Sequence, residues 1–166
     1  MSQRYEIRLA GEGGQGMILA GAILAEAAAI YDGRNVVMTQ AYAPQQRGGF
    51  TETELVLSDG EIDYPKILAA NLLLALTQDA FNRHSRQMAK GGLILVDPSL
   101  VDATEVEDAD IERLPLKEMA IEVTGSAMAI NLVAPGGDLG TNQVRLPGGP
   151  QCCPEETLLR EKPPPQ

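Results

Sequence analysis

Tryptophan is absent from this 166-residue sequence, and aromatic residues make up only 4% of it. A hydrophobic core therefore has to be built mainly from Ala, Leu, Ile and Val. Apolar residues as a whole supply 44% of the chain, which is an ordinary share for a globular protein. The length allows one domain with a substantial core, but not comfortably two.

Basic residues are scarce: 13 Lys and Arg stand against 23 Asp and Glu, giving a formal net charge of −10. This balance disfavours nucleic acid and anionic membranes as partners, because both require clustered cations. No apolar run reaches the roughly 18 residues of a membrane span. The N-terminus leads at once into charged residues and glycines, so we expect no signal peptide and a cytoplasmic protein.

Residues that bind metals or carry out catalysis are also few. The only cysteines, Cys152 and Cys153, are adjacent, so the chain cannot supply the four thiolates of an iron–sulfur cluster. The single histidine, His84, lies among polar residues, and we expect it on an exposed helix surface with no special role. No catalytic triad and no metal-ligand spacing is visible. We therefore predict neither a catalytic residue nor a metal site in this chain.

Alternating and continuous apolar patterns predict strands and helices in turn along the chain. Strands are predicted at residues 4–10, 35–40, 50–58, 71–77, 92–98 and 111–116. Helices are predicted at 17–30, 61–68 (a turn into a short helix), 78–90 (stopped by Gly91-Gly92) and 117–134. This order indicates an α/β fold: a single Rossmann-like layered domain with a mostly parallel sheet. The helix at 17–30 is apolar almost all round, so it should pack on several sides, within the domain or against another chain.

The stretch GEGGQG, between the first strand and the first helix, is the first candidate site. Its candidate residues are Gly11, Gly13, Gly14, Gln15 and Gly16. The G-x-G-x-x-G spacing suggests a dinucleotide turn, but the acid expected about 20 residues later is missing, because that position is Met38-Thr39-Gln40. Two interpretations stay open with similar weight: a tight turn that packs closely on a neighbour, and a turn that contacts an anion or cofactor.

The loop after the second strand is the other candidate, through Tyr42, Arg47, Gly48 and Gly49. An arginine beside two glycines can present its guanidinium to a phosphate or carboxylate, although a solvated loop arginine is an equal alternative. Both loops follow strands, so they can meet at one edge of the sheet.

These two loops, GEGGQGM and YAPQQRGGF, together with the later stretches IDYPKI, LLLALTQDAF and GGLILVDPSLV, resemble the gamma subunit of 2-oxoacid:ferredoxin oxidoreductases. The similarity runs from about residue 5 to residue 134. The stretch TETELVLSDGEIDYP looks most like the 2-oxoglutarate enzymes, while pyruvate, branched-chain and indolepyruvate versions share the pattern. Ala43 departs from the glycine usual in the family. The resemblance implies that residues 1–134 form a pyruvate/ketoisovalerate oxidoreductase gamma-type domain.

The resemblance further implies a multi-subunit enzyme that converts a 2-oxoacid and coenzyme A into acyl-CoA, carbon dioxide and reduced ferredoxin. Thiamine diphosphate and iron–sulfur clusters would lie on alpha, beta and delta partner subunits, and this chain alone would bind no cofactor. It would be an accessory, non-catalytic subunit, with GEGGQG and Arg47 near coenzyme A or a partner interface. The alternative from another class is a stand-alone Rossmann-like module that binds a nucleotide.

The character of the sequence changes after Ala134. Residues 135–166 have no helical period and concentrate prolines, glycines and both cysteines, so we expect an irregular tail. Back-translation of residues 135–139 permits a one-base shift that gives L-G-A-I, a family-like continuation. The tail is therefore a candidate frameshift product, which sequencing of the coding DNA would decide.

Overall fold

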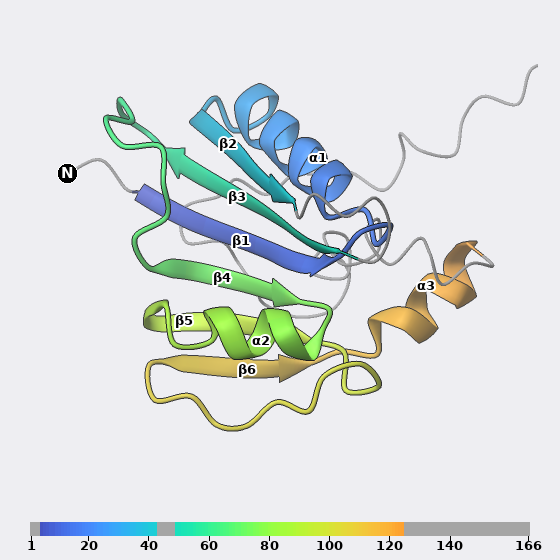
Figure 1. The fold of residues 1–166 in the computed structure, drawn as a ribbon. Helices are drawn as coiled ribbons and strands as arrows, with labels where there is room; N and C mark the ends of the chain where they lie inside the picture. The colour runs from blue at the N-terminus through green and yellow to red at the C-terminus, as the bar shows by residue number, and fades with distance from the viewer. Residues whose placement is uncertain (1–3, 43–48, 125–166) are drawn as a thin grey trace, which may run out of the picture.

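The computed structural model describes residues 4–42 and 49–124, which form six strands and three helices (Figure 1). In chain order these are β1 (Arg4–Glu12), α1 (Met17–Ile30), β2 (Asn35–Tyr42), β3 (Phe50–Ser58), β4 (Ala70–Ala75), α2 (Gln78–His84), β5 (Met88–Val96), β6 (Ala109–Arg113) and α3 (Leu116–Thr124). Each predicted strand is present, with ends that differ by a few residues. The loop residues Arg47 and Gly48, and the whole predicted tail, lie outside the described residues.

The strands form one mixed sheet in the order β2-β3-β1-β4-β5-β6. The ladders β1–β4, β4–β5 and β5–β6 are parallel, whereas β3 runs antiparallel to both β1 and β2. Three of the five ladders are thus parallel, as predicted. The first strand of the chain lies inside the sheet, between β3 and β4, where both of its faces are covered.

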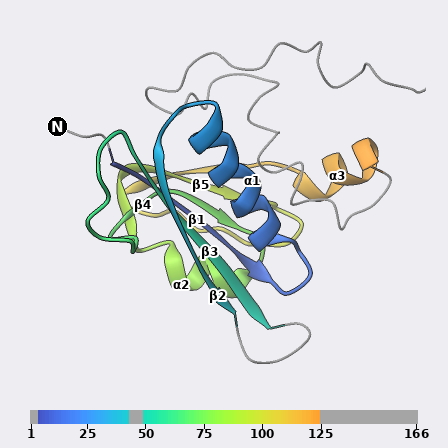
Figure 2. The ribbon, with the colours of Figure 1, turned by 90° about the horizontal axis from the view of Figure 1, so that it is seen from above.

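Helices cover both faces of the sheet (Figure 2). On one face α1 packs over β2 and β3, and Leu116 of α3 joins the same core as Leu9 and Leu74. On the other face Phe81 of α2 packs with Leu73 and Ile94. The predicted layered α/β domain is confirmed.

Helix α1 has the predicted bounds, but the described domain packs against one side of it only. Its buried residues are Met17, Ala20, Gly21 and Ala28. A Cβ on Gly21 would collide with Cγ2 of Thr53, so glycine allows the helix to lie close to β3. Leu19, Ile23 and Ile30 face away and are 52%, 41% and 65% exposed. Packing of this helix on several sides is therefore not achieved within the described residues.

Helix α2 ends at His84, so the predicted helix over residues 78–90 is too long. The backbone N–H of Ala70 donates to the carbonyl of Gln87, and β5 then begins at Met88. The predicted stop, Gly91-Gly92, lies within β5 instead, where the ladder with β4 shifts register. Gly91 has φ +71°, and a Cβ on Gly92 would lie 2.9 Å from the carbonyl oxygen of Ala89. These glycines thus permit an irregular strand rather than ending a helix.

The short helix predicted within 61–68 is absent from the structure, which has an irregular loop there. Pro65 disfavours helical backbone at Tyr64. Charged side chains satisfy the loop's backbone groups: the Arg4 guanidinium donates to the carbonyls of Tyr64 and Lys66, and the Glu6 carboxylate accepts from the N–H groups of Leu68 and Ala69. The helix predicted at 117–134 begins at Leu116, and its part beyond Thr124 lies outside the described residues.

Candidate functional site

The glycine turn after β1 is closed by the side chain of Gln15. The side-chain Oε1 accepts from the backbone N–H of Glu12 at 2.7 Å, and the backbone N–H of Gln15 donates to the Glu12 carbonyl at 3.1 Å. A Cβ on Gly11 would collide with that same Oε1. Gly14 and Gly16 have φ of +99° and +73°, which L-residues rarely adopt. Gln15 therefore shapes the turn from within, a role that the sequence pattern did not indicate.

The structure brings the two candidate loops into contact. The backbone N–H of Gly13 donates to the carbonyl of Gly49 at 2.8 Å. Strand register aligns the same region, because Gly11 pairs with Thr51 and Thr51 pairs with Tyr42. The expected meeting of the loops is thus observed for the described residues. Arg47 and Gly48 lie outside them, and only the backbone of Tyr42 is described.

The first turn of α1 opens directly onto this glycine turn. Gly16 occupies the N-cap position, where it offers no side-chain oxygen, and the first turn contains no acidic residue. The leading N–H groups of a helix have no partner inside the helix and carry the positive end of its dipole. Uncapped N–H groups beside flexible glycine backbone are suited to a phosphate or carboxylate.

A buried cluster of charged side chains lies on the α2 face of the sheet, next to this turn. Arg8 of β1 forms ion pairs with Glu52 and Glu54 of β3 at 2.8 and 2.7 Å. The guanidinium also donates to Oε1 of Gln87 at 2.8 Å. The side chain of Arg8 is only 7% exposed, and those of the two glutamates are 12% and 14% exposed. Lys66, more exposed, lies 3.7 Å from Glu54.

His84 belongs to this cluster, so the expectation of an exposed histidine without a special role is wrong. Nδ1 of His84 lies 3.0 Å from Nη1 of Arg8. A guanidinium can only donate, so Nδ1 accepts and the ring proton resides on Nε2, which is 3.6 Å from Glu52. Burial, reinforced by the charge of Arg8, lowers the pKa of His84 to about 4, and burial raises the pKa of Glu52. The ring is therefore neutral at pH 7.

An aromatic contact connects the charged cluster to the second loop. The ring of Phe50, the residue after Gly49, stacks on the His84 ring with 5.8 Å between centroids. The guanidinium carbon of Arg83 lies 4.7 Å from the Phe50 ring centroid. Arg83 and His84 of α2 thus both contact Phe50, the residue directly after Gly49. The cluster supports the loop contact but is itself shielded from solvent.

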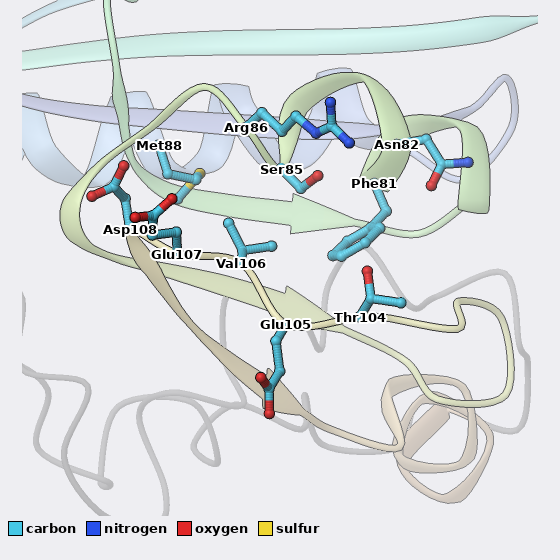
Figure 3. A pocket seen from close by; sticks show the side chains of 10 residues that line it. All are labelled: Phe81, Asn82, Ser85, Arg86, Met88, Thr104, Glu105, Val106, Glu107 and Asp108. Atoms are coloured by element: carbon cyan, nitrogen blue, oxygen red, sulfur yellow. The ribbon is translucent and has the colours of Figure 1, made fainter.

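A separate hollow of about 510 Å³ lies between α2 and the segment that leads into β6 (Figure 3). Phe81, Met88 and Val106 are among its apolar lining, while Arg86 and Glu107 are among its charged residues. It contains no residue of the glycine turn and none of the buried cluster. We therefore place the candidate site at the meeting of the two loops rather than in this hollow.

The chemistry of the described residues limits what they could bind. In residues 4–42 and 49–124 no group of three or more His, Cys, Asp or Glu side chains could hold a metal ion. No cysteine lies in these ranges, so they offer no thiolate for an iron–sulfur cluster. Among the described helices none is long and apolar enough to cross a membrane. The turn and the first N–H groups of α1 fit one kind of ligand group well, an anion.

Comparison with known proteins gives matches over most of the chain. A profile of the family described as pyruvate ferredoxin/flavodoxin oxidoreductase matches residues 6–147. The 2-oxoglutarate synthase subunit KorC of Methanocaldococcus jannaschii is 40% identical over 138 residues, which cover 82% of this chain and 74% of that relative. The matched residues therefore include both glycine loops and all of the described domain except Arg4 and Tyr5.

Two solved structures have the same fold. The gamma subunit of a keto/oxoacid ferredoxin oxidoreductase from Geobacter sulfurreducens matches with a TM-score of 0.72 and 41% identity, over 82% of this chain and 75% of that chain. The 2-oxoglutarate:ferredoxin oxidoreductase of Magnetococcus marinus, solved with 2-oxoglutarate, coenzyme A and succinyl-CoA, also has a TM-score of 0.72. It is 22% identical, and the match covers 82% of this chain but 24% of that longer chain, so this likeness concerns the fold alone.

Proposed function

Because this chain belongs to the pyruvate ferredoxin/flavodoxin oxidoreductase family, as a gamma subunit of the 2-oxoacid:ferredoxin oxidoreductases, we propose that it is an accessory subunit of the 2-oxoglutarate enzyme. That choice of substrate is supported by the 40% identity to a 2-oxoglutarate synthase subunit. The reaction of the assembled enzyme would convert 2-oxoglutarate and coenzyme A into succinyl-CoA and carbon dioxide while reducing ferredoxin.

The contribution of this chain would be a phosphate contact for coenzyme A at the glycine turn. The observation that carries this proposal is the bond from Gly13 to Gly49, which joins the two glycine loops beside the uncapped start of α1. Phosphate oxygens accept hydrogen bonds from such N–H groups and are favoured by the helix dipole. Gly11, Gly14, Gln15 and Gly16 would hold the turn in shape, and Tyr42, Arg47 and Gly48 complete the proposed site.

The accessory, non-catalytic role is supported by the state of the titratable groups near the turn. Arg8, Glu52 and His84 are buried and engaged with one another, so none is positioned to take a proton from a substrate. Thiamine diphosphate would stabilise the carbanion formed on decarboxylation, and iron–sulfur clusters would carry the electrons. Both would be bound by alpha, beta and delta partners, as the resemblance to this family implies.

Steady-state kinetics of the assembled oxidoreductase test this role. The Arg47→Ala variant should raise the apparent KM for coenzyme A, with kcat and the KM for 2-oxoglutarate unchanged, because a contact that binds substrate and transition state equally affects KM alone. Lys90→Ala, which removes an exposed cation of β5, is the matched control. An unchanged KM in Arg47→Ala would refute the coenzyme A contact. A chain that retains nucleotide when purified alone, and never co-purifies with partner subunits, would instead identify a stand-alone nucleotide-binding module.

A further inference from the structure

The outward side of α1 is apolar where an ordinary surface helix is polar. Its exposed residues recur with helical spacing and form what we call the outward stripe: Leu19, Ala22, Ile23, Glu26, Ala29 and Ile30. Only Glu26 carries a charge. Tyr31, directly after the helix, is 71% exposed and extends this surface. An amphipathic helix at a free surface places its charged and polar residues on this side.

The other helices of the same chain provide the contrast. The exposed residues of α2 are all polar: Gln78, Asp79, Asn82 and Arg83. Among residues 116–122 of α3, whose side chains the structure describes, the exposed ones are Lys117, Glu118, Ile121 and Glu122, of which one is apolar. These two helices thus present mainly polar residues on their described exposed sides. The outward stripe departs from this pattern over the full length of α1.

β2, the strand beside α1, likewise lacks charged residues, although it forms an edge of the sheet. β2 packs against α1 and is the terminal strand on that side of the sheet. None of its eight residues is charged, whereas β6, at the opposite edge, contains Asp110, Glu112 and Arg113. Exposed edge strands normally carry charges that prevent pairing with another chain. The α1–β2 flank lacks this protection on both elements.

We propose that the outward stripe, with the adjacent edge of β2, is the surface on which this chain docks onto the larger subunits of the oxidoreductase. The inference rests on the proposed function and adds the surface that joins the subunits. Permanent interfaces are more apolar than ordinary surface, as this stripe is. The partner surface would be apolar, with a Lys or Arg opposite Glu26.

Two further observations favour the larger subunits over other occupants. First, α1 begins at the glycine turn, so a subunit that shares a ligand with this turn also meets the first turn of the stripe at Leu19. Second, a domain of this fold forms 24% of the longer Magnetococcus marinus chain. In that protein the domain is covalently joined to the rest of a longer chain. A separate subunit lacks this covalent link, so it can stay attached only through a stable interface.

Co-expression of the full-length chain with the other oxidoreductase subunits tests the surface. Leu19→Gln with Ile23→Gln places two polar helix formers in the stripe, at positions that are 52% and 41% exposed. Glu118→Gln with Glu122→Gln is the control, because it introduces two glutamines at the same spacing on the exposed side of α3 without altering an apolar surface. Affinity purification should recover at least about tenfold less partner with the stripe variant than with the control or the wild type.

The possible outcomes separate the surface from the proposed function. A wild-type chain that recovers no partner subunit overturns the proposed function. Equal recovery by the wild type and the stripe variant overturns the surface alone. If light scattering shows that the isolated wild-type chain is a dimer and that the stripe variant is a monomer, a second copy of the chain covers the stripe and the proposed docking of the larger subunits there is overturned. If the double variant does not fold, Ile23→Ala, a smaller change at one half-exposed position of the stripe, provides the same comparison.

Discussion

Replacing Arg8 with methionine should strongly destabilise the domain, because the buried charge cluster depends on this one cation. Methionine keeps much of the side-chain volume but removes the positive charge. Glu52 and Glu54 would then face each other across a side chain that cannot compensate them. His84 Nδ1 and Gln87 Oε1 would each lose a donor.

The expected cost follows from the burial of the partners. The three side chains are 7%, 12% and 14% exposed, so water cannot replace the lost attraction. Removing one partner of a buried ion pair typically costs about 3–5 kcal/mol. A domain of this size is stable by about 5–15 kcal/mol, so Arg8→Met should lose a large fraction of the total. Glu52, whose pKa is raised by burial, is destabilising when unpaired only while it is charged, so the deficit should be smaller at acidic pH than at pH 7.

Urea unfolding followed by far-ultraviolet circular dichroism is the suitable measurement, since the chain has no tryptophan to report by fluorescence. Asp79→Asn is the control, because it breaks the exposed pair between Asp79 and Arg83 and should cost less than about 1 kcal/mol. Adding Glu52→Gln and Glu54→Gln to Arg8→Met should restore part of the lost stability. The reasoning is refuted if Arg8→Met costs no more than the control, or if the added substitutions destabilise further.

Two further variants test the packing around the site. His84→Asn keeps an acceptor for Arg8 but cannot titrate. The lowered pKa of His84 gives stability that is present above pH 6.5 and lost as the pH falls towards 4. The raised pKa of Glu52 acts in the opposite direction in both proteins. Urea unfolding at pH 7 and 4.5 should therefore show His84→Asn losing roughly 2 kcal/mol less than the wild type, and equal losses would contradict the assigned protonation. Gly21→Ala should destabilise by about 1–2 kcal/mol, because the clash with buried Thr53 exceeds the gain of about 1 kcal/mol in helix propensity; a higher midpoint of thermal unfolding would refute this packing.

Local patterns predicted α1 and the six strands well, because the apolar periodicity and the turn residues that define each element lie within or beside its own segment. A glycine turn before the helix and Asp32-Gly33 after it define α1 without reference to the rest of the chain. The two candidate loops were also correctly placed at one edge of the sheet. Their glycines mark places where backbone approaches backbone, and Gly13 and Gly49 form such a contact.

The errors arose where distant residues decide the local structure. Helix α2 ends early because Gln87 bonds to Ala70, a contact that no local periodicity indicates. The segment 61–68 is irregular because Arg4 and Glu6, about 60 residues earlier, satisfy its backbone groups. His84 lies in a polar sequence but faces Arg8, Glu52 and Phe50 from other elements. The role of Gln15 was missed because its hydrogen bond to Glu12 follows from the shape of the turn.

The position of β1 inside the sheet has a consequence for the order in which the chain can fold during synthesis. β1 and α1 leave the ribosome before β3 and β4, yet among the described strands these two are the ones that pair with β1, and they end at Ser58 and Ala75. Until β3 and β4 have been made, β1 lacks both neighbouring strands, and the almost wholly apolar helix α1 lacks most of the sheet that covers its buried side. Such exposed segments aggregate readily, and pairing between distant strands forms slowly. Low temperature, which weakens hydrophobic association, should therefore raise the yield of soluble chain, and premature truncation before β4 should yield an insoluble product.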